Sequence, residues 1–239
     1  MSNTIKAIIL GIIIGGSLIY SSFIVSKTFL DVKNLDNVIS VSGSAKQKVI
    51  SDSARWTGNF TRSANKDQLK EGYNQMKADE KIVSDFFIAQ GFKDKFEISP
   101  VFMNEIYKND TNAPKEYNLV QSVEIKSDDV NKMKELAKNS DKLVEKGIIF
   151  SANSVEYYYS KLPEIRISLL PEAIKDAKNR ADIISKSSGK NVDQIKSVTM
   201  GVVQVMPVGA VEISDYGSYD TSGIEKEVMI TVKTVFGLN

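Results

Sequence analysis

The chain has 239 residues, and its 31 Lys and Arg residues nearly balance its 30 Asp and Glu residues, giving a formal net charge of +1. That balance produces no overall basic field of the kind that attracts nucleic acid, so we expect no nucleic-acid partner. Histidine and cysteine are both absent, which excludes Ser-His-Asp and Cys-His catalysis and removes the usual ligands of zinc, haem and iron–sulfur clusters. We therefore expect no metal and no cofactor.

The first feature in chain order is an uncharged apolar stretch from Ala7 to Val25, which Lys6 and Lys27 bracket. As a helix it would span about 28 Å, close to the ~30 Å hydrocarbon core of a bilayer. A cleaved signal peptide is the alternative, but its apolar core is shorter and ends in a small-x-small cleavage site. No Ala-x-Ala pattern follows this stretch. We predict an uncleaved anchor and leave cleavage as the alternative.

The anchor divides the chain into four parts: a short tail (1–6), the membrane helix (7–25), a polar linker (26–37) and a body (38–239). About 200 residues are enough for one large or two small domains with a buried core. The flanking charges do not decide the orientation of the helix. We favour a single-pass protein with a short cytoplasmic tail and an extracytoplasmic body.

Gly11 and Gly15 form a GxxxG pattern within the anchor. Small residues at this spacing let two membrane helices approach closely, so the pattern predicts helix association. The alternative is a chance match, because glycine is frequent in membrane helices.

The body alternates strand and helix patterns. Period-two alternation is clear around Trp56, for which we predict a core position, and in residues 227–236. We expect Ser127 or Asp128 to cap one helix and Pro171 to lie in the first turn of another. The predicted order is strands 38–44 and 54–61, helix 69–91, strands 96–107 and 117–126, helix 127–146, extended segment 148–160, helix 171–189, strand 192–207, loop 208–223 and strand 227–236.

Strands in antiparallel runs with helices between them predict an α+β fold, in which antiparallel sheets carry helices on one face. The order is strand-strand-helix-strand-strand-helix-strand-helix-strand-strand, after one N-terminal transmembrane helix. A hairpin-helix unit occurs twice in it, without self-similarity at the level of single residues.

Four tyrosines are candidate ligand contacts: Tyr157 and Tyr159 on one face of an extended segment, and Tyr216 and Tyr219 in loop 208–223. In this interpretation the loop is a mobile lid over a small molecule or peptide. The alternative is that strand tyrosines pack against their neighbours with their hydroxyls in water. Asp215 and Asp220 in the same loop match no EF-hand spacing, so we predict no calcium site there.

Six segments of the body follow one another in this order: VISVSGSAKQKVISDSARWTGNF, AQGF followed by EISPVF, YNLVQSVEIKSDDVNKMKEL, LVEKGIIFSANSVEYYYS, AIKDAKNRADIISKSSGKNVDQIKSV and EVMITVKTVFGL. This ordered set resembles that of SIMPL-domain proteins over about residues 38–238. The chain departs from its bacterial relatives at Ser42-Gly43-Ser44 and Ser51-Asp52, which leaves the predicted fold unchanged. The resemblance implies a bacterial secreted or membrane-anchored protein with its body on the periplasmic side, without catalytic residues. Some members look like subunits of large homo-oligomers, and some are linked to stress tolerance.

Three functions remain open. The first is a non-enzymatic, membrane-anchored module that forms a homo-oligomer, with a role in envelope stress tolerance. The second is a small-ligand or peptide-binding module with loop 208–223 as its lid and an unknown ligand. The third is an enzyme that uses two carboxylates as acid and base, which would have to face one cleft.

Overall fold

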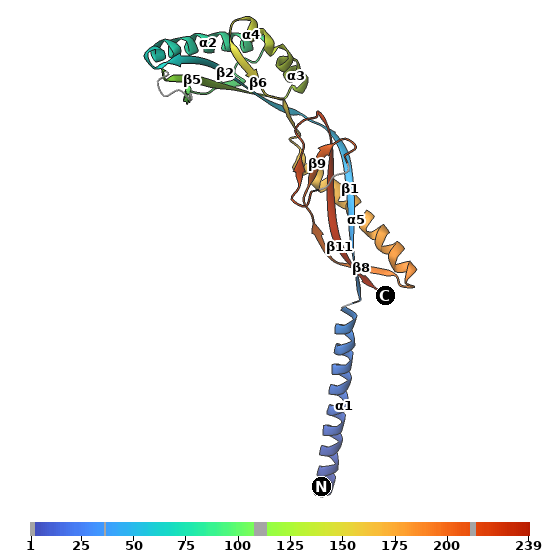
Figure 1. The fold of residues 1–239 in the computed structure, drawn as a ribbon. Coiled ribbons are helices and arrows are strands. Elements are labelled where there is room, and N and C mark those ends of the chain that lie inside the picture. Colours follow the sequence, from blue (N-terminus) through green and yellow to red (C-terminus); the bar gives the residue numbers. More distant parts are fainter. Residues whose placement is uncertain (1–2, 36, 108–113, 211–213) are drawn as a thin grey trace. The chain divides into compact units, whose positions relative to one another are not determined.

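The computed structural model describes residues 3–35, 37–107, 114–210 and 214–239, without the side chains of residues 3–7, 31 and 33–35. The chain divides into two compact units, each of which is described by itself (Figure 1). Unit 1 comprises residues 1–45, 168–202 and 230–239, and unit 2 comprises residues 46–167 and 203–229. Three elements contribute residues to both units: β1 (Val38–Ile50), α5 (Leu162–Ser187) and β11 (Glu225–Leu238).

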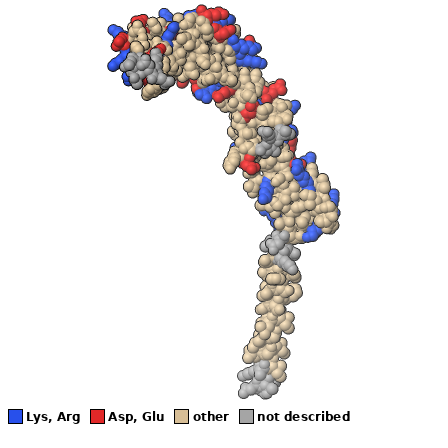
Figure 2. Space-filling model, viewed as in Figure 1, with Lys and Arg blue, Asp and Glu red and all other residues tan. Residues whose placement is uncertain are grey.

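The N-terminal apolar stretch forms one continuous helix, α1 (Asn3–Leu35). Residues Ile8–Leu30 are long and apolar enough to cross a membrane, and no part of this span is buried by the rest of the chain. The visible face of the helix is uncharged between its described ends (Figure 2). The helix continues past Val25 to Leu35, so residues 26–35 of the expected linker are helical.

In unit 1, β11 lies between β1 and β8 (Val192–Met200), and β8 runs antiparallel to it. Helix α5 packs against β1 through small residues. Ala173 and Ala177 are fully buried, and a Cβ added to Gly43 of β1 would collide with the backbone at both positions. The glycine and the alanines therefore let the helix approach the strand closely.

In unit 2, β2 (Ser53–Asn65) pairs antiparallel with the whole of β5 (Glu116–Ser127), from Ala54 to Asn65. The short strands β3 (Phe96–Ile98) and β4 (Phe102–Ile106) pair in succession with β5. On the other side, β6 (Ile149–Ala152) and β7 (Glu156–Tyr158) pair in succession with β2. Near these strands, β9 (Gln204–Pro207) pairs antiparallel with β11 and parallel with β10 (Ser218–Tyr219).

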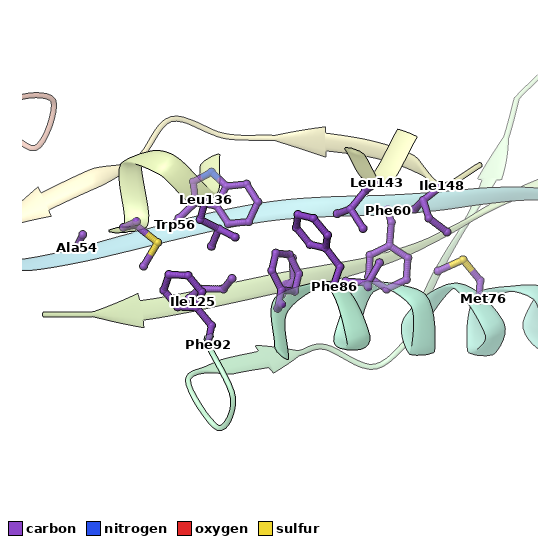
Figure 3. Packing of buried hydrophobic residues seen from close by; sticks show 14 of the residues in the cluster. Ala54, Trp56, Phe60, Met76, Phe86, Phe92, Ile125, Leu136, Leu143 and Ile148 are labelled. Carbon is purple, nitrogen blue, oxygen red and sulfur yellow. The ribbon is translucent and has the colours of Figure 1, made fainter. Parts of the chain in front are cut away.

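The core of unit 2 lies between this sheet and its helices, which are η1 (Lys66–Gln68), α2 (Leu69–Ala89), α3 (Val130–Lys138), η2 (Asn139–Asp141) and α4 (Lys142–Glu145). Trp56 is fully buried there, its ring centroid 5.9 Å from that of Phe87, and its Nε1 donates a hydrogen bond to the Asn153 carbonyl at 2.9 Å. Figure 3 shows this cluster of aromatic and aliphatic side chains. The predicted core position of Trp56 is confirmed.

The predicted α+β class is confirmed, and the differences are local. The N-cap of α3 is Asp129, whose carboxylate accepts the Lys132 N–H at 2.9 Å, so the expected caps Ser127 and Asp128 were wrong. Pro171 lies inside α5, which begins nine residues earlier at Leu162, and not in the first turn of a helix. The expected strand 192–207 is two strands, β8 and β9, which belong to different units.

Candidate functional site

The four candidate tyrosines do not form one site. Tyr157 belongs to the core of unit 2, where burial raises the pKa of its phenol. Tyr219 and Tyr159 do meet, because the backbone N–H of Tyr159 donates to the Tyr219 hydroxyl at 2.9 Å. The Tyr219 ring also lies 5.9 Å from the ring of Tyr158, whereas Tyr216 is almost fully exposed.

The described part of the expected lid, residues 208–210 and 214–223, is attached to unit 2 at several points. Ser218 and Tyr219 form β10, and the carbonyl of Thr221 accepts the N–H of Tyr157 at 2.8 Å. Residues 211–213 of the predicted loop lie outside the described residues. The lid function remains a prediction.

Lys226 provides a further attachment from a fully buried position. Its ammonium donates to the backbone carbonyl of Asp220 at 2.5 Å and lies 3.3 Å from the Asp220 carboxylate. Burial alone would raise the pKa of Asp220, but hydrogen bonds from Ser222 and Lys226 outweigh it and lower that pKa. The Asp220 carboxylate therefore already accepts hydrogen bonds from groups of the protein. Among the described residues, no cluster of three carboxylates suits a metal ion.

A hollow of about 500 Å³ lies next to the beginning of the loop in unit 2. Val208 and Tyr159 line it together with residues 47–50 of β1 and Glu225. Ile50 is two-thirds exposed there, so an apolar surface faces the solvent. A predicted contact residue, Tyr159, and the first residue of the predicted lid, Val208, therefore border the same hollow.

A second feature is an open apolar row on β8 in unit 1. Ile195, Val198 and Met200 are 46%, 40% and 40% exposed. The register with β11 places them opposite Phe236, Thr234 and Val232, which are buried on the same face of the sheet. On this face the β11 residues are buried, whereas the three β8 residues opposite them are exposed to solvent.

β8 is also an edge strand, because in the described part of the chain it pairs only with β11. Its second backbone edge thus has unpaired N–H and C=O groups, which can pair with another strand. We define Ile195, Val198, Met200 and this free edge as the β8 face. The alternation of Val198, Met200 and Val202 was visible in the sequence, but exposure was not, because alternation alone does not show what covers a strand.

Gly11 and Gly15 lie on α1 with open space around them, since a Cβ added to either would meet no atom within 4 Å. Nothing in the described chain obstructs the approach of a second helix. The predicted helix association stays a prediction.

Together, an apolar N-terminal helix and an α+β body define a class of proteins compatible with membrane anchoring. A family model for SIMPL, described as a protein of unknown function (DUF541), matches residues 39–236, and the chain belongs to this family. A search of curated proteins finds no match to the chain.

Proposed function

We propose that this chain is a non-enzymatic, single-pass membrane protein whose extracytoplasmic body forms a homo-oligomer on the periplasmic side of a bacterial inner membrane. The observation that carries the proposal is the β8 face, which combines a free strand edge with three exposed apolar side chains. Soluble proteins usually protect such edges, and exposed apolar patches mark interaction surfaces.

The anchor strengthens this argument, because it confines all copies to one membrane. Tethering raises the effective concentration of the β8 faces relative to free diffusion, so a weak contact suffices. The near-neutral charge of the chain opposes association little. Gly11 and Gly15 supply a second contact within the membrane in this proposal.

The non-enzymatic part of the proposal rests on composition, since the chain has neither histidine nor cysteine. The role in envelope stress tolerance rests on the family resemblance alone. A strain that lacks this protein should lose viability under membrane-damaging stress, and its viability should return with the wild-type chain but not with an assembly-deficient variant.

The test is the mass of the full chain in mild detergent, measured by light scattering after size exclusion. We expect a discrete oligomer for the wild type and a smaller species for Val198→Lys, which places a charge in the β8 face. The matched control is Thr199→Lys, which adds the same charge on the same strand but on its other face. A monomeric wild type at micromolar concentration, or equal effects of both substitutions, would contradict the proposal.

A second test separates the anchor from the body. In this proposal the double variant Gly11→Leu, Gly15→Leu weakens the membrane contact but keeps the contact through β8. It should therefore give a smaller loss of oligomer than Val198→Lys. A complete loss with the double variant would assign the assembly to the anchor and not to the β8 face.

The hollow beside Val208 and Tyr159 favours a second candidate function, the binding of an apolar small molecule or peptide under loop 208–223. The fluorescent anion 1-anilinonaphthalene-8-sulfonate, whose aromatic rings bind apolar surfaces, should bind the full chain. The fluorescence of the probe in detergent without protein is subtracted. Ile50→Asp should reduce the signal, while Ile149→Asp, at another exposed position of unit 2 outside this hollow, should not. Equal signals for both variants would remove this candidate.

A further inference from the structure

Strand β4 of unit 2 carries large apolar side chains that are exposed on both of its faces. Phe102 is 58% exposed, Met103 46% and Ile106 37%, and Tyr107, directly after the strand, is 90% exposed. Because neighbouring residues of a strand point to opposite faces, Phe102 and Ile106 lie on one face and Met103 on the other. Packing within the described chain therefore does not account for these side chains.

The outer backbone edge of β4 is also free. In the described part of the chain β4 pairs only with β5, so the N–H and C=O groups of its second edge can pair with another strand. Natural edge strands are usually protected by lysine, proline or an inward charge. β4 has no lysine or proline, and its one charged residue, Glu105, forms an ion pair with Lys115 of the same chain at 3.1 Å. The edge is therefore open to a partner strand.

The sequence of β4 suits antiparallel pairing with itself. In a pairing centred on Asn104, this residue lies opposite Asn104 of a second copy, and Phe102 lies opposite Ile106. Opposite residues share a face and contact each other, and an aromatic side chain beside a β-branched one stabilises such a pair. Twofold symmetry gives this contact twice. The remaining pair, Met103 opposite Glu105, brings no two charges of the same sign together.

A second copy would also continue a largely apolar row on the open face of the sheet. The registers between neighbouring strands align four residues across this face, one from each strand: Phe102 (β4), Val120 (β5), Thr61 (β2) and Ile149 (β6). The opposite face of the sheet carries Leu119, which is buried in the core of unit 2. Ile106 of a second copy would extend the row beyond Phe102.

The size of this surface indicates what kind of partner it fits. Large side chains such as Phe and Tyr bury about 150–250 Å² each, so the exposed parts of Phe102, Met103, Ile106 and Tyr107 offer roughly 400 Å². A stable complex between freely diffusing proteins buries about 800 Å² per partner, which is about twice as much. Copies that share one membrane need less, because anchoring raises their effective concentration. The small area and the self-complementary sequence therefore both favour a second copy of this chain.

We propose that β4 pairs antiparallel with β4 of a second copy, centred on Asn104, and so joins the sheets of two copies of unit 2 edge to edge. Such a contact is isologous, because each copy contributes the same residues. The inference rests on the membrane anchor of the proposed function. It does not depend on the β8 face, which belongs to a different strand in the other unit.

The test is disulfide formation between copies of the full chain in phospholipid vesicles, oxidised with copper–phenanthroline. The chain has no cysteine, so Asn104→Cys carries a single thiol. Opposite residues of an antiparallel pair have Cα atoms about 4.5–5.5 Å apart, within the range of a disulfide. We expect Asn104→Cys to form a covalent dimer. Lys142→Cys, at an exposed position of α4, is the control for random collisions and should form little dimer.

Two further variants test the register of the pairing. Phe102→Cys or Ile106→Cys alone should give no more dimer than the collision control, because each thiol would lie about 14 Å along the strand from the same thiol of the second copy. A mixture of the two proteins should form a mixed dimer, because Phe102 of one copy lies opposite Ile106 of the other.

Phe102→Lys tests the apolar contact in the Asn104→Cys protein. A charge opposite Ile106 should lower the yield of dimer by about tenfold or more. The matched control is Ile149→Lys, at a residue that is 60% exposed on the same face of the sheet but lies on β6, and it should leave the yield unchanged. Val198→Lys in the β8 face should also leave it unchanged. A thermal unfolding curve verifies that each variant is folded.

Three outcomes would overturn this contact: a yield for Asn104→Cys no higher than for Lys142→Cys, as much dimer from Phe102→Cys alone as from the mixture, or equal yields for folded Phe102→Lys and Ile149→Lys. Carbonate extraction of the vesicles separates these outcomes from a failure of the anchor. A chain that the vesicles retain without the disulfide would contradict the β4 contact alone, and the oligomer through the β8 face would stand. A chain that carbonate releases would overturn the anchor and this inference together.

Discussion

Thr234 places a hydroxyl in the interior of unit 1. The residue is fully buried on β11, and its Oγ1 has no hydrogen-bond partner among the described residues. A buried hydroxyl without a partner loses its hydration and gains nothing in return. Valine has nearly the same shape without the polar atom, so it fits the site better.

We predict that Thr234→Val raises the free energy of unfolding by about 1 kcal/mol. Urea unfolding followed by circular dichroism measures the change. Ser122→Ala is the contrasting control, because the Ser122 hydroxyl donates to Asn59 at 2.7 Å, and its removal should destabilise the protein. A loss of stability with Thr234→Val would show that the hydroxyl has a partner.

Asp176 on α5 connects the helix to β1 through its carboxylate. Its carboxylate accepts the backbone N–H of Ser44 at 2.9 Å and lies 3.0 Å from Nε of Arg180. The Ser44 hydrogen bond first, and Arg180 second, lower the pKa of this carboxyl. Folding therefore favours the deprotonated form, and the stabilisation exists only while the group is ionised.

Because folding lowers the pKa of Asp176, the stability of the folded chain depends on pH. The contribution of Asp176 is fully present above the ordinary carboxyl pKa of about 4 and is lost as the pH falls through the lowered pKa of the folded state. We predict that Asp176→Asn makes stability fall less steeply with acid below about pH 4. Arg180→Gln removes only the guanidinium and keeps the Ser44 hydrogen bond. The free energy of unfolding of this variant should therefore fall with acid at an intermediate slope. Identical slopes for all three proteins would contradict this assignment.

At the scale of elements, the contact between α5 and β1 requires the absence of a side chain at Gly43. A Cβ there would lie 2.7 Å from Cβ of Ala177 and would also collide with the Ala173 carbonyl and the Ala177 N–H. Because two of these three groups are backbone, no change of rotamer relieves the contact. The helix as a whole would have to move away.

We predict that Gly43→Ala destabilises unit 1 by about 1–3 kcal/mol or more, measured as a lower urea midpoint. Ser42→Ala is the matched control, since it makes a small change at the neighbouring, exposed position of β1. Adding Ala177→Gly to Gly43→Ala should restore little, because the backbone collisions remain. Full rescue would indicate that the side chain alone limits the approach.

At the scale of the whole molecule, a prediction concerns the side of the membrane on which the body lies. The chain has no cysteine, so a single engineered cysteine reports its own location. We predict that a membrane-impermeant maleimide labels Lys186→Cys in intact spheroplasts, and labels Asn3→Cys only after lysis. The reverse pattern would place the body in the cytoplasm.

A related prediction concerns the N-terminus. An uncleaved anchor predicts that the mature protein in membranes retains the residues before Val25, which mass spectrometry of the N-terminal peptide detects. A mature chain that begins within or after residues 21–26 would show that the apolar helix is a signal peptide. The homo-oligomer would then depend on the β8 face alone.

Much of the fold could be predicted from the sequence, because the deciding patterns are local. An uncharged run of membrane length predicts the apolar helix α1, and alternation over residues 227–236 predicts the strand β11. Val228, Ile230 and Val232 are buried as the alternation predicts, although Glu227 and Met229 on the other face are buried as well. The residues that cap or end a helix were harder to predict. Ser127, Asp128 and Asp129 are all chemically able to cap α3, and only backbone geometry selects Asp129.

The candidate sites depended on tertiary structure, because exposure depends on what packs above a residue. Val198 and Val232 both lie in alternating apolar stretches of the sequence, yet Val232 is buried and Val198 is 40% exposed. Likewise, Tyr157 and Tyr159 are two residues apart, yet Tyr157 lies in the core while Tyr159 borders an open hollow. Periodicity determines which side of a strand a residue occupies. The position of distant segments such as α5 determines whether that side becomes a core or a surface that can bind a partner.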